Sequence, residues 1–310
     1  MPDVYIPVHS EQSARLGTLH GVRVREDTLY TNHKGAEKKG VRKQAEKNVE
    51  KLQEILRKML AQDEVVLYVA RCQAPVSAFE QMTLGWYIYY ATRAVLVLTN
   101  RRLLHFLVKS DGAWKKRLRV VSWGDIELAK VKGWFSRTLE LKYRDGKKET
   151  YWKMRGDDAR KIKMLVPAIL AAGSVESTAA QSVVSLCPGC LAQLTPQVYQ
   201  CANCRAEFKD EKTMVRRSLL IPGGGYFYIG YWFLGIGDFL VEAYLLIVTI
   251  IFLVVAAGGM PDPFVESGEA PATGGVALGA AIFVGVILAV EKWLTIHHCR
   301  RFIREFIPTK

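Results

Sequence analysis

Three hydrophobic patterns follow one another along the chain. Within residues 34–60, apolar side chains recur at helical spacing among many Lys and Glu residues, which predicts a basic amphipathic helix. Residues 63–171 switch to short runs rich in β-branched and aromatic residues, a pattern typical of strands. Two long apolar runs then occupy residues 239–258 and 275–296. We therefore expect a multidomain chain, with a helix and a strand-rich domain in front and an α-helical membrane portion behind.

The strand-rich domain is expected to be antiparallel and closed by one helix. Its segments SDGAW and RDGKK each place Asp-Gly between alternating apolar runs, the strongest short signal for a hairpin. A helical pattern begins near Gly156 or Asp157. About seven strands capped by one helix predict an α+β barrel or bent sandwich. The predicted strands are EVVLYVARC, RAVLVLTN, RRLLHFLV, KKRLRVVSW, IELAKVKGWF, TLELKYR and KETYWKM.

The two apolar runs are long enough to cross a membrane, because about 20 residues span a hydrocarbon core of roughly 30 Å. Residues 218–237 are also uncharged over such a length, but they contain Pro222, three consecutive glycines and clustered Tyr and Trp residues. These residues favour an interfacial or re-entrant segment over a third span. We therefore predict a membrane domain at 218–296 with two spans, forming a helical hairpin.

The charges around the hairpin predict its orientation. The connection between the spans carries Asp262, Glu266 and Glu269 without Lys or Arg, whereas arginines flank both ends of the hairpin. The positive-inside rule then places both termini, including the basic tail 297–310, in the cytoplasm.

Four charged residues near the ends of the spans predict a polar site in the membrane. Asp238 and Glu242 are four residues apart and share a helix face, and an antiparallel partner brings Glu291 and Lys292 to the same depth. The site is interpreted either as an acid-lined site for protons or cations, or as interfacial carboxylates that pair with lysine or reach water. Small residues such as Gly275 and Gly279 favour close helix contacts, within the hairpin or in an oligomer.

Four of the six cysteines form two C-x-x-C pairs, and these predict one structural zinc ion. The pairs CPGC and CANC lie close together, and the fragment resembles a small zinc ribbon at residues 186–210. A redox pair is the weaker interpretation, because a second pair follows and no βαβ unit surrounds the first. Four ligands leave no open coordination position, which argues against catalysis at the metal. The predicted ligands are Cys187, Cys190, Cys201 and Cys204.

Charge narrows the function classes further. The chain has 310 residues with 43 Lys and Arg against 30 Asp and Glu, and all of the excess positive charge lies before Ser218. A basic front and an apolar rear exclude a wholly soluble enzyme, a secreted disulfide miniprotein and a disordered chain. Basic residues at two adjoining predicted strands form a candidate face for anionic lipid or a partner, or are ordinary solvated residues. These residues are Arg101, Arg102, Lys115, Lys116, Arg117 and Arg119.

Two stretches resemble known families. The segments VLTNRRLL, VSWGDIELAKV and TLELKYRDGK resemble bacterial pleckstrin-homology-like (PH-like, GRAM-related) domains. The segment PGGGYFYIGYWFLGIGDF, which leads into a span, is similar to the start of the two-transmembrane-helix (TM-two) domain. The first resemblance implies lipid or protein binding at the bacterial inner membrane, with few enzymes among the members. The second implies a short membrane hairpin without catalytic chemistry.

These observations lead to one main functional expectation. We expect a membrane-anchored, non-enzymatic adaptor or sensor whose PH-like domain binds anionic lipid or a protein partner. The sequence contains no phosphate-binding loop, no G-x-S-x-G elbow and no H-E-x-x-H motif. The alternative is an oligomeric pore or transport accessory that uses Asp238 and Glu242. Nucleic-acid binding is disfavoured, since it rests on net charge alone. The remaining expected segments are an N-terminal extension at 1–33 and a flexible linker at 172–185.

Overall fold

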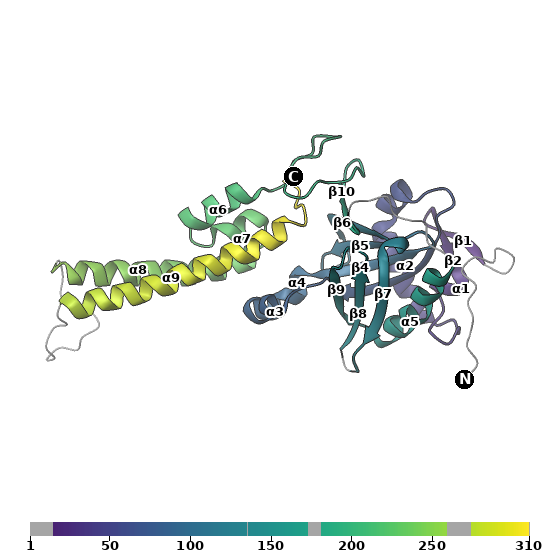
Figure 1. Cartoon of the computed structure of the whole chain (residues 1–310), viewed down its shortest axis with the longest axis horizontal. Helices are drawn as coiled ribbons and strands as arrows, with labels where there is room; N and C mark the ends of the chain where they lie inside the picture. Colours follow the sequence, from purple (N-terminus) through teal and green to yellow (C-terminus); the bar gives the residue numbers. More distant parts are fainter. Residues whose placement is uncertain (1–14, 135, 173–180, 259–273, 310) are drawn as a thin grey trace. The chain divides into compact units, whose positions relative to one another are not determined.

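The computed structural model describes residues 15–134, 136–172, 181–258 and 274–309. The chain forms two compact units, Met1–Ala206 and Glu207–Lys310. The acidic connection between the predicted spans lies outside the described residues. Each unit is described by itself below (Figure 1).

A large, mainly antiparallel sheet forms the first unit, and all seven predicted strands are present in it. The strand order is β10-β6-β5-β4-β3-β9-β8-β7, with the β1–β2 hairpin attached to β3. Among the described strands the sheet does not close, so a closed barrel is not formed; β7 and β10 are its two ends. The strands are β1 Leu16–Leu19, β2 Val22–Arg25, β3 Val66–Gln73, β4 Arg93–Thr99, β5 Arg102–Val108, β6 Trp114–Ser122, β7 Ile126–Lys132, β8 Arg137–Tyr143, β9 Lys148–Met154 and β10 Val183–Leu186.

Both faces of the central strands are buried. In β4, Ala94, Leu96 and Leu98 belong to the core beneath the closing helix, whereas Val95 and Val97 belong to a second core on the opposite face. Two-sided burial explains why β4 reads as a continuous apolar run instead of an alternating one. The second core therefore needs a covering element of its own.

Helix α2, Lys39–Met59, covers that second face. A helix is present within the predicted range 34–60, although it begins only at Lys39, and it buries a stripe of Ala45, Val49, Leu52, Ile55 and Leu56 against the sheet. Its charged residues lie on the remaining surface. The amphipathic pattern of this helix is therefore explained by its packing on the sheet.

The closing helix and the N-terminal strands complete the unit. Helix α5, Gly156–Ala171, begins where the sequence predicts and packs on the first core. The short helix α1, Glu26–Leu29, and the β1–β2 hairpin place Val22 and Val24 against α2. The described part of the predicted extension 1–33 thus belongs to the sheet unit.

A helical insert separates β3 from β4. It contains α3 Ala78–Leu84, the 3-10 turn η1 Gly85–Tyr87 and α4 Ile88–Ala91. In Figure 1 this insert projects away from the sheet. The sequence pattern of this stretch does not predict a helix.

Two long apolar helices, α8 Trp232–Ala256 and α9 Gly274–Ile303, dominate the second unit and lie side by side. Both are long and apolar enough to cross a membrane, as predicted, although α8 begins earlier than the expected Phe239. The segment 218–237 is not a continuous helix. It is divided among the end of α6 Glu211–Leu220, the six-residue α7 Gly224–Ile229 and the start of α8.

Glycine makes the tight turns of this segment possible. Gly223 and Gly230 have φ of 65° and 87°, in the left-handed region. A Cβ on Gly223 would lie 2.2 Å from the carbonyl oxygen of Gly235, so a side chain does not fit there. The close approach of α7 to α8 therefore depends on this glycine.

Candidate metal centre and charged clusters

Two matching turns present the four cysteines of the C-x-x-C pairs. In the first turn the Leu191 N–H donates to the Cys187 carbonyl over 2.9 Å, and in the second the Arg205 N–H donates to the Cys201 carbonyl over 2.9 Å. Leu191 and Arg205 both have positive φ, 62° and 59°. The equal spacing of the two motifs thus folds into the same backbone turn twice.

The four sulfurs converge on one point. The Sγ atoms of Cys187 and Cys204 are 3.6 Å apart, those of Cys190 and Cys201 are 3.5 Å apart, and all four lie within 4.8 Å of one another. Tetrahedral zinc with bonds of about 2.3 Å requires sulfur separations of about 3.8 Å. Each of these cysteines is a free thiol. The arrangement therefore fits the predicted zinc ion, with these four side chains as its ligands.

Local interactions favour the thiolate form, which binds metal ions, at one of the four cysteines. A backbone hydrogen bond from Ala192 lowers the pKa of Cys190 to about 6. Burial raises the pKa of Cys187 to about 12. A divalent cation offsets such a burial penalty, because thiolates are the form that binds it. With four sulfur ligands the ion has no open position, so its role would be structural.

Strand β10 connects the cysteine turns directly to the sheet. Val183 pairs with Val121 and Leu186 with Leu118 of β6, and Cys187 follows immediately. The cluster of four cysteines is therefore an extension of the sheet.

The predicted flexible linker at 172–185 is wrong at its C-terminal end, where the chain forms strand β10. Its last three residues belong to β10, and residues 173–180 lie outside the described part of the chain. Val183 and Val184 are β-branched, and their backbone groups pair with the edge of β6, which would otherwise be unpaired. Small, polar composition alone could not reveal that edge.

The predicted basic residues of the β4–β5 turn form ion pairs. Arg101 pairs with Asp63. The guanidinium of Arg102 lies 2.9 Å from a carboxylate oxygen of Glu64, which is fully buried, and it also donates to the Met59 carbonyl over 2.7 Å. These contacts join the turn to the end of α2.

A bulge in β6 redirects the other predicted basic residues. Lys116 has a φ of 58°, and the register of β6 with β5 shifts beside it. Strict alternation along the strand, which the prediction assumed, therefore fails. Lys116 is exposed, Arg117 is buried, and Lys115 donates to the Tyr90 and Ala91 carbonyls over 3.2 and 3.0 Å.

Arg119 belongs to a polar cluster inside the sheet. It pairs with Glu149 of β9, which also accepts hydrogen bonds from Tyr143 and Tyr151 over 2.8 and 3.2 Å. His105 packs edge-on against the Tyr151 ring. Burial alone would raise the pKa of Glu149, but the Arg119 guanidinium and these hydrogen bonds lower it. The cluster connects two strands that are not neighbours, so Arg119 has a structural role.

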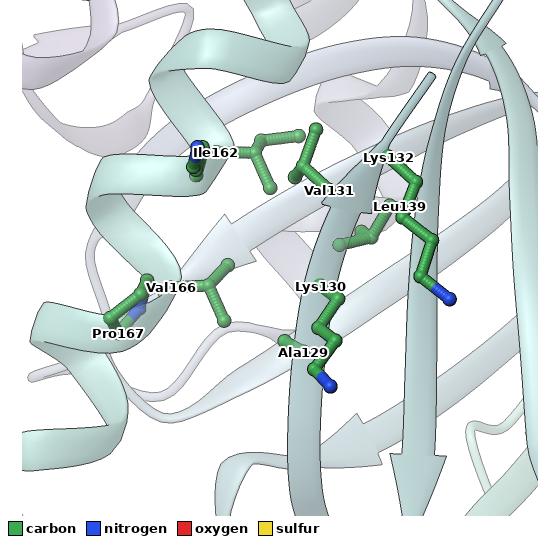
Figure 2. A pocket seen from close by; sticks show the side chains of 9 residues that line it. Ala129, Lys130, Val131, Lys132, Leu139, Ile162, Val166 and Pro167 are labelled. Atoms are coloured by element: carbon green, nitrogen blue, oxygen red, sulfur yellow. The ribbon is translucent and has the colours of Figure 1, made fainter.

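Grooves on the described part of the sheet unit include the following pair. One, of about 270 Å³, lies between α5 and the edge strand β7, where Ile162 and Val166 face Ala129 and Val131 (Figure 2). The other, of about 420 Å³, lies beside β10 and mixes basic and acidic side chains. Its charged lining residues are Glu64, Arg101, Arg102 and Asp125.

The second unit brings the four predicted polar residues of its long helices together. The Lys292 ammonium lies 2.6 Å from Glu242, which is 1% exposed. The carboxylates of Asp238, Glu242 and Glu291 lie within 4.8 Å of one another, and the Thr295 hydroxyl donates to Asp238 over 3.0 Å. Antiparallel packing of α8 and α9 thus places these residues at one depth, as the sequence predicts.

The same cluster contacts the last turn of α6 and the turn that precedes α7. The Gly223 N–H donates to Glu242 over 2.7 Å, and Lys292 donates to the Ser218 carbonyl over 2.5 Å. The interpretation in which the acids pair with lysine therefore describes the Glu242–Lys292 contact.

Sequence reasoning missed the acidic partners of the basic residues. Glu64 and Glu149 neutralise Arg102 and Arg119, but they lie far away in the sequence. The one sequence feature that could have indicated these partners is an acidic residue within or next to an apolar run, where burial of an unpaired carboxylate would be costly. The role of the six basic residues in lipid binding stays a prediction.

No protein-family model matches the chain, and comparisons with curated proteins and with solved structures find no match. The fold and the sites therefore rest on the geometry described above.

Proposed function

We propose that the protein is a membrane-anchored, non-enzymatic adaptor or sensor whose sheet unit binds anionic lipid at the cytoplasmic face. The observation that carries this proposal is the combination, in one chain, of two long apolar helices with a strongly basic sheet unit. The PH-like resemblance of residues 63–171 agrees with it. An anchor raises the local lipid concentration, so even weak headgroup contacts would suffice.

The metal centre supports a structural part within this proposal. Four sulfur ligands would complete the coordination of zinc, and β10 transmits that rigidity to the sheet edge. The zinc ribbon would then hold the end of the sheet unit in a fixed conformation before the chain continues into the membrane domain.

Vesicle flotation tests the proposal. Residues 1–206, checked for folding by circular dichroism, would be floated with phosphatidylcholine vesicles with and without phosphatidylglycerol, across a salt series. We expect binding only to the anionic vesicles and its loss at high salt, because the contacts are electrostatic. Lys116→Glu should weaken binding more than the matched control Lys47→Glu on α2. Equal binding to neutral vesicles, or no binding at low salt, would reject the proposal.

A second candidate function is an oligomeric pore or transport accessory. The three carboxylates within 4.8 Å of one another, against one lysine, are the observation that favours it. Gly275 and Gly279 lie on open parts of α9, where a second helix could approach closely. Ion flux in reconstituted vesicles tests this candidate, and unchanged flux after Asp238→Asn with Glu242→Gln would dismiss it.

A further inference from the structure

The helical insert between β3 and β4, defined as residues 76–92, exposes an apolar stripe. Met82 is 75% exposed and Trp86 67%, and Phe79 and Tyr90 are also exposed. Phe79 and Met82 are three residues apart and so lie on one face of α3, whereas Trp86 and Tyr90 follow in η1 and α4, after Gly85 with its φ of 52° has ended α3. Exposed apolar stripes of this kind mark contact surfaces.

The insert has a defined conformation. Ser77 and Glu80 form a reciprocal capping box at the start of α3, in which the Glu80 backbone N–H donates to the Ser77 hydroxyl over 3.1 Å. On the inner side Leu84, Tyr87 and Ile88 are buried. The outer stripe is therefore held in place by packing and capping, not merely left in a disordered loop.

Basic side chains surround the base of the insert. Lys115 donates to the Tyr90 and Ala91 carbonyls, and the Arg93 guanidinium lies 5.9 Å from the Tyr90 ring centre. Lys153 lies 3.2 Å from the Tyr89 ring centre. The insert itself carries a single charged residue, Glu80, which is buried in the cap. The insert thus combines an uncharged, aromatic outer part with positively charged side chains where it joins the sheet.

We propose that this insert enters the headgroup region of an anionic bilayer, the same membrane that α8 and α9 span. Trp, Tyr, Phe and Met side chains are favoured at that depth, and Lys and Arg are attracted to the anionic headgroups above it. This inference rests on the proposed function, for which it names the contact site. The proposed lipid-contact site is therefore the insert and not the strand face of Arg117 and Arg119, whose side chains lie within the fold.

A lipid occupant is favoured over a protein by charge and by tethering. The positively charged side chains next to the insert complement anionic lipid, and the apolar helices of the same chain would anchor the insert near a bilayer. In a second copy of this chain the same residues are positively charged, so two inserts would repel each other. Contact with a protein is therefore an outcome of the test, not the proposal.

Photo-crosslinking in the full chain tests the inference. Benzoylphenylalanine would replace Trp86, or Met82 in a second variant, and the protein would be placed in nanodiscs of phosphatidylcholine with phosphatidylglycerol. After illumination we expect lipid adducts by mass spectrometry, at least fivefold above a matched probe at the exposed Glu50 on α2. Zinc content and circular dichroism establish that each variant is folded.

The outcomes separate this inference from the proposed function. A crosslink to protein, or adducts no more frequent than at Glu50 for both probe positions, would overturn the insertion of this element even if flotation shows anionic-lipid binding. Salt-independent or absent flotation together with lipid adducts at residue 86 would reject the electrostatic function and leave the insertion standing.

Discussion

Replacement of one cysteine in the metal centre gives the most direct test of the structure. In Cys190→Ser the side chain keeps nearly the same shape, but a neutral hydroxyl replaces a thiol whose pKa the backbone lowers to about 6. The remaining three sulfurs still converge, so the variant changes the chemistry of the site more than its shape.

The magnitude follows from the number of ligands. Structural zinc in four-ligand sites binds with roughly 10–16 kcal/mol, so one thiolate of four contributes about 3 kcal/mol. A loss of about 3 kcal/mol weakens the affinity more than about a hundredfold. Purified wild-type chain should hold one zinc ion, and Cys190→Ser should lose most of it during dialysis against a weak chelator.

Elemental analysis by inductively coupled plasma mass spectrometry measures this directly. Cys72→Ala is the control, because Cys72 lies in the sheet core and not among the four converging sulfurs. Hydrogen exchange should also speed up in residues 183–186 of Cys190→Ser, since β10 runs directly into the site. Full zinc retention by Cys190→Ser, or iron in place of zinc in the wild type, would refute the assignment.

Three further predictions concern the rest of the chain. Lys292→Met should lower the free energy of unfolding in detergent by roughly 3–5 kcal/mol, because it removes the lysine that pairs with the buried Glu242. Adding Glu242→Gln should recover most of this loss. A double variant as unstable as the single one would contradict the pairing role. Burial lowers the pKa of Lys161 to about 8, so between about pH 8 and 10.5 the unfolded chain binds more protons than the folded one and stability rises with pH. In urea unfolding, wild type should therefore gain up to about 3 kcal/mol relative to Lys161→Met across that range, and a pH-independent difference would rule this out. Leu56→Ala should cost roughly 2–5 kcal/mol, whereas Lys58→Ala on the exposed side of α2 should cost little; equal losses would mean that α2 does not cover the sheet.

Local patterns in the sequence determined most of the longer elements of this protein. The seven strands, the helices α2 and α5 and the two long apolar helices follow from periodicity and composition, which depend on near neighbours along the chain. The spacing of the two C-x-x-C pairs likewise determined the four candidate metal ligands, because each turn needs only its own residues. Helical spacing also placed Asp238 and Glu242 on one face, opposite Lys292.

Only the tertiary structure decided how these elements use their surfaces. That β10 joins the sheet, that α2 covers its second face and that the sheet stays open depend on which unpaired edges and apolar faces meet. The surroundings of the predicted basic residues were decided in the same way, since Arg102 and Arg119 pair with Glu64 and Glu149 far away in the sequence and the bulge at Lys116 breaks the alternation. Pairing of distant charges and edges is a property of the folded chain, so no local pattern contains it.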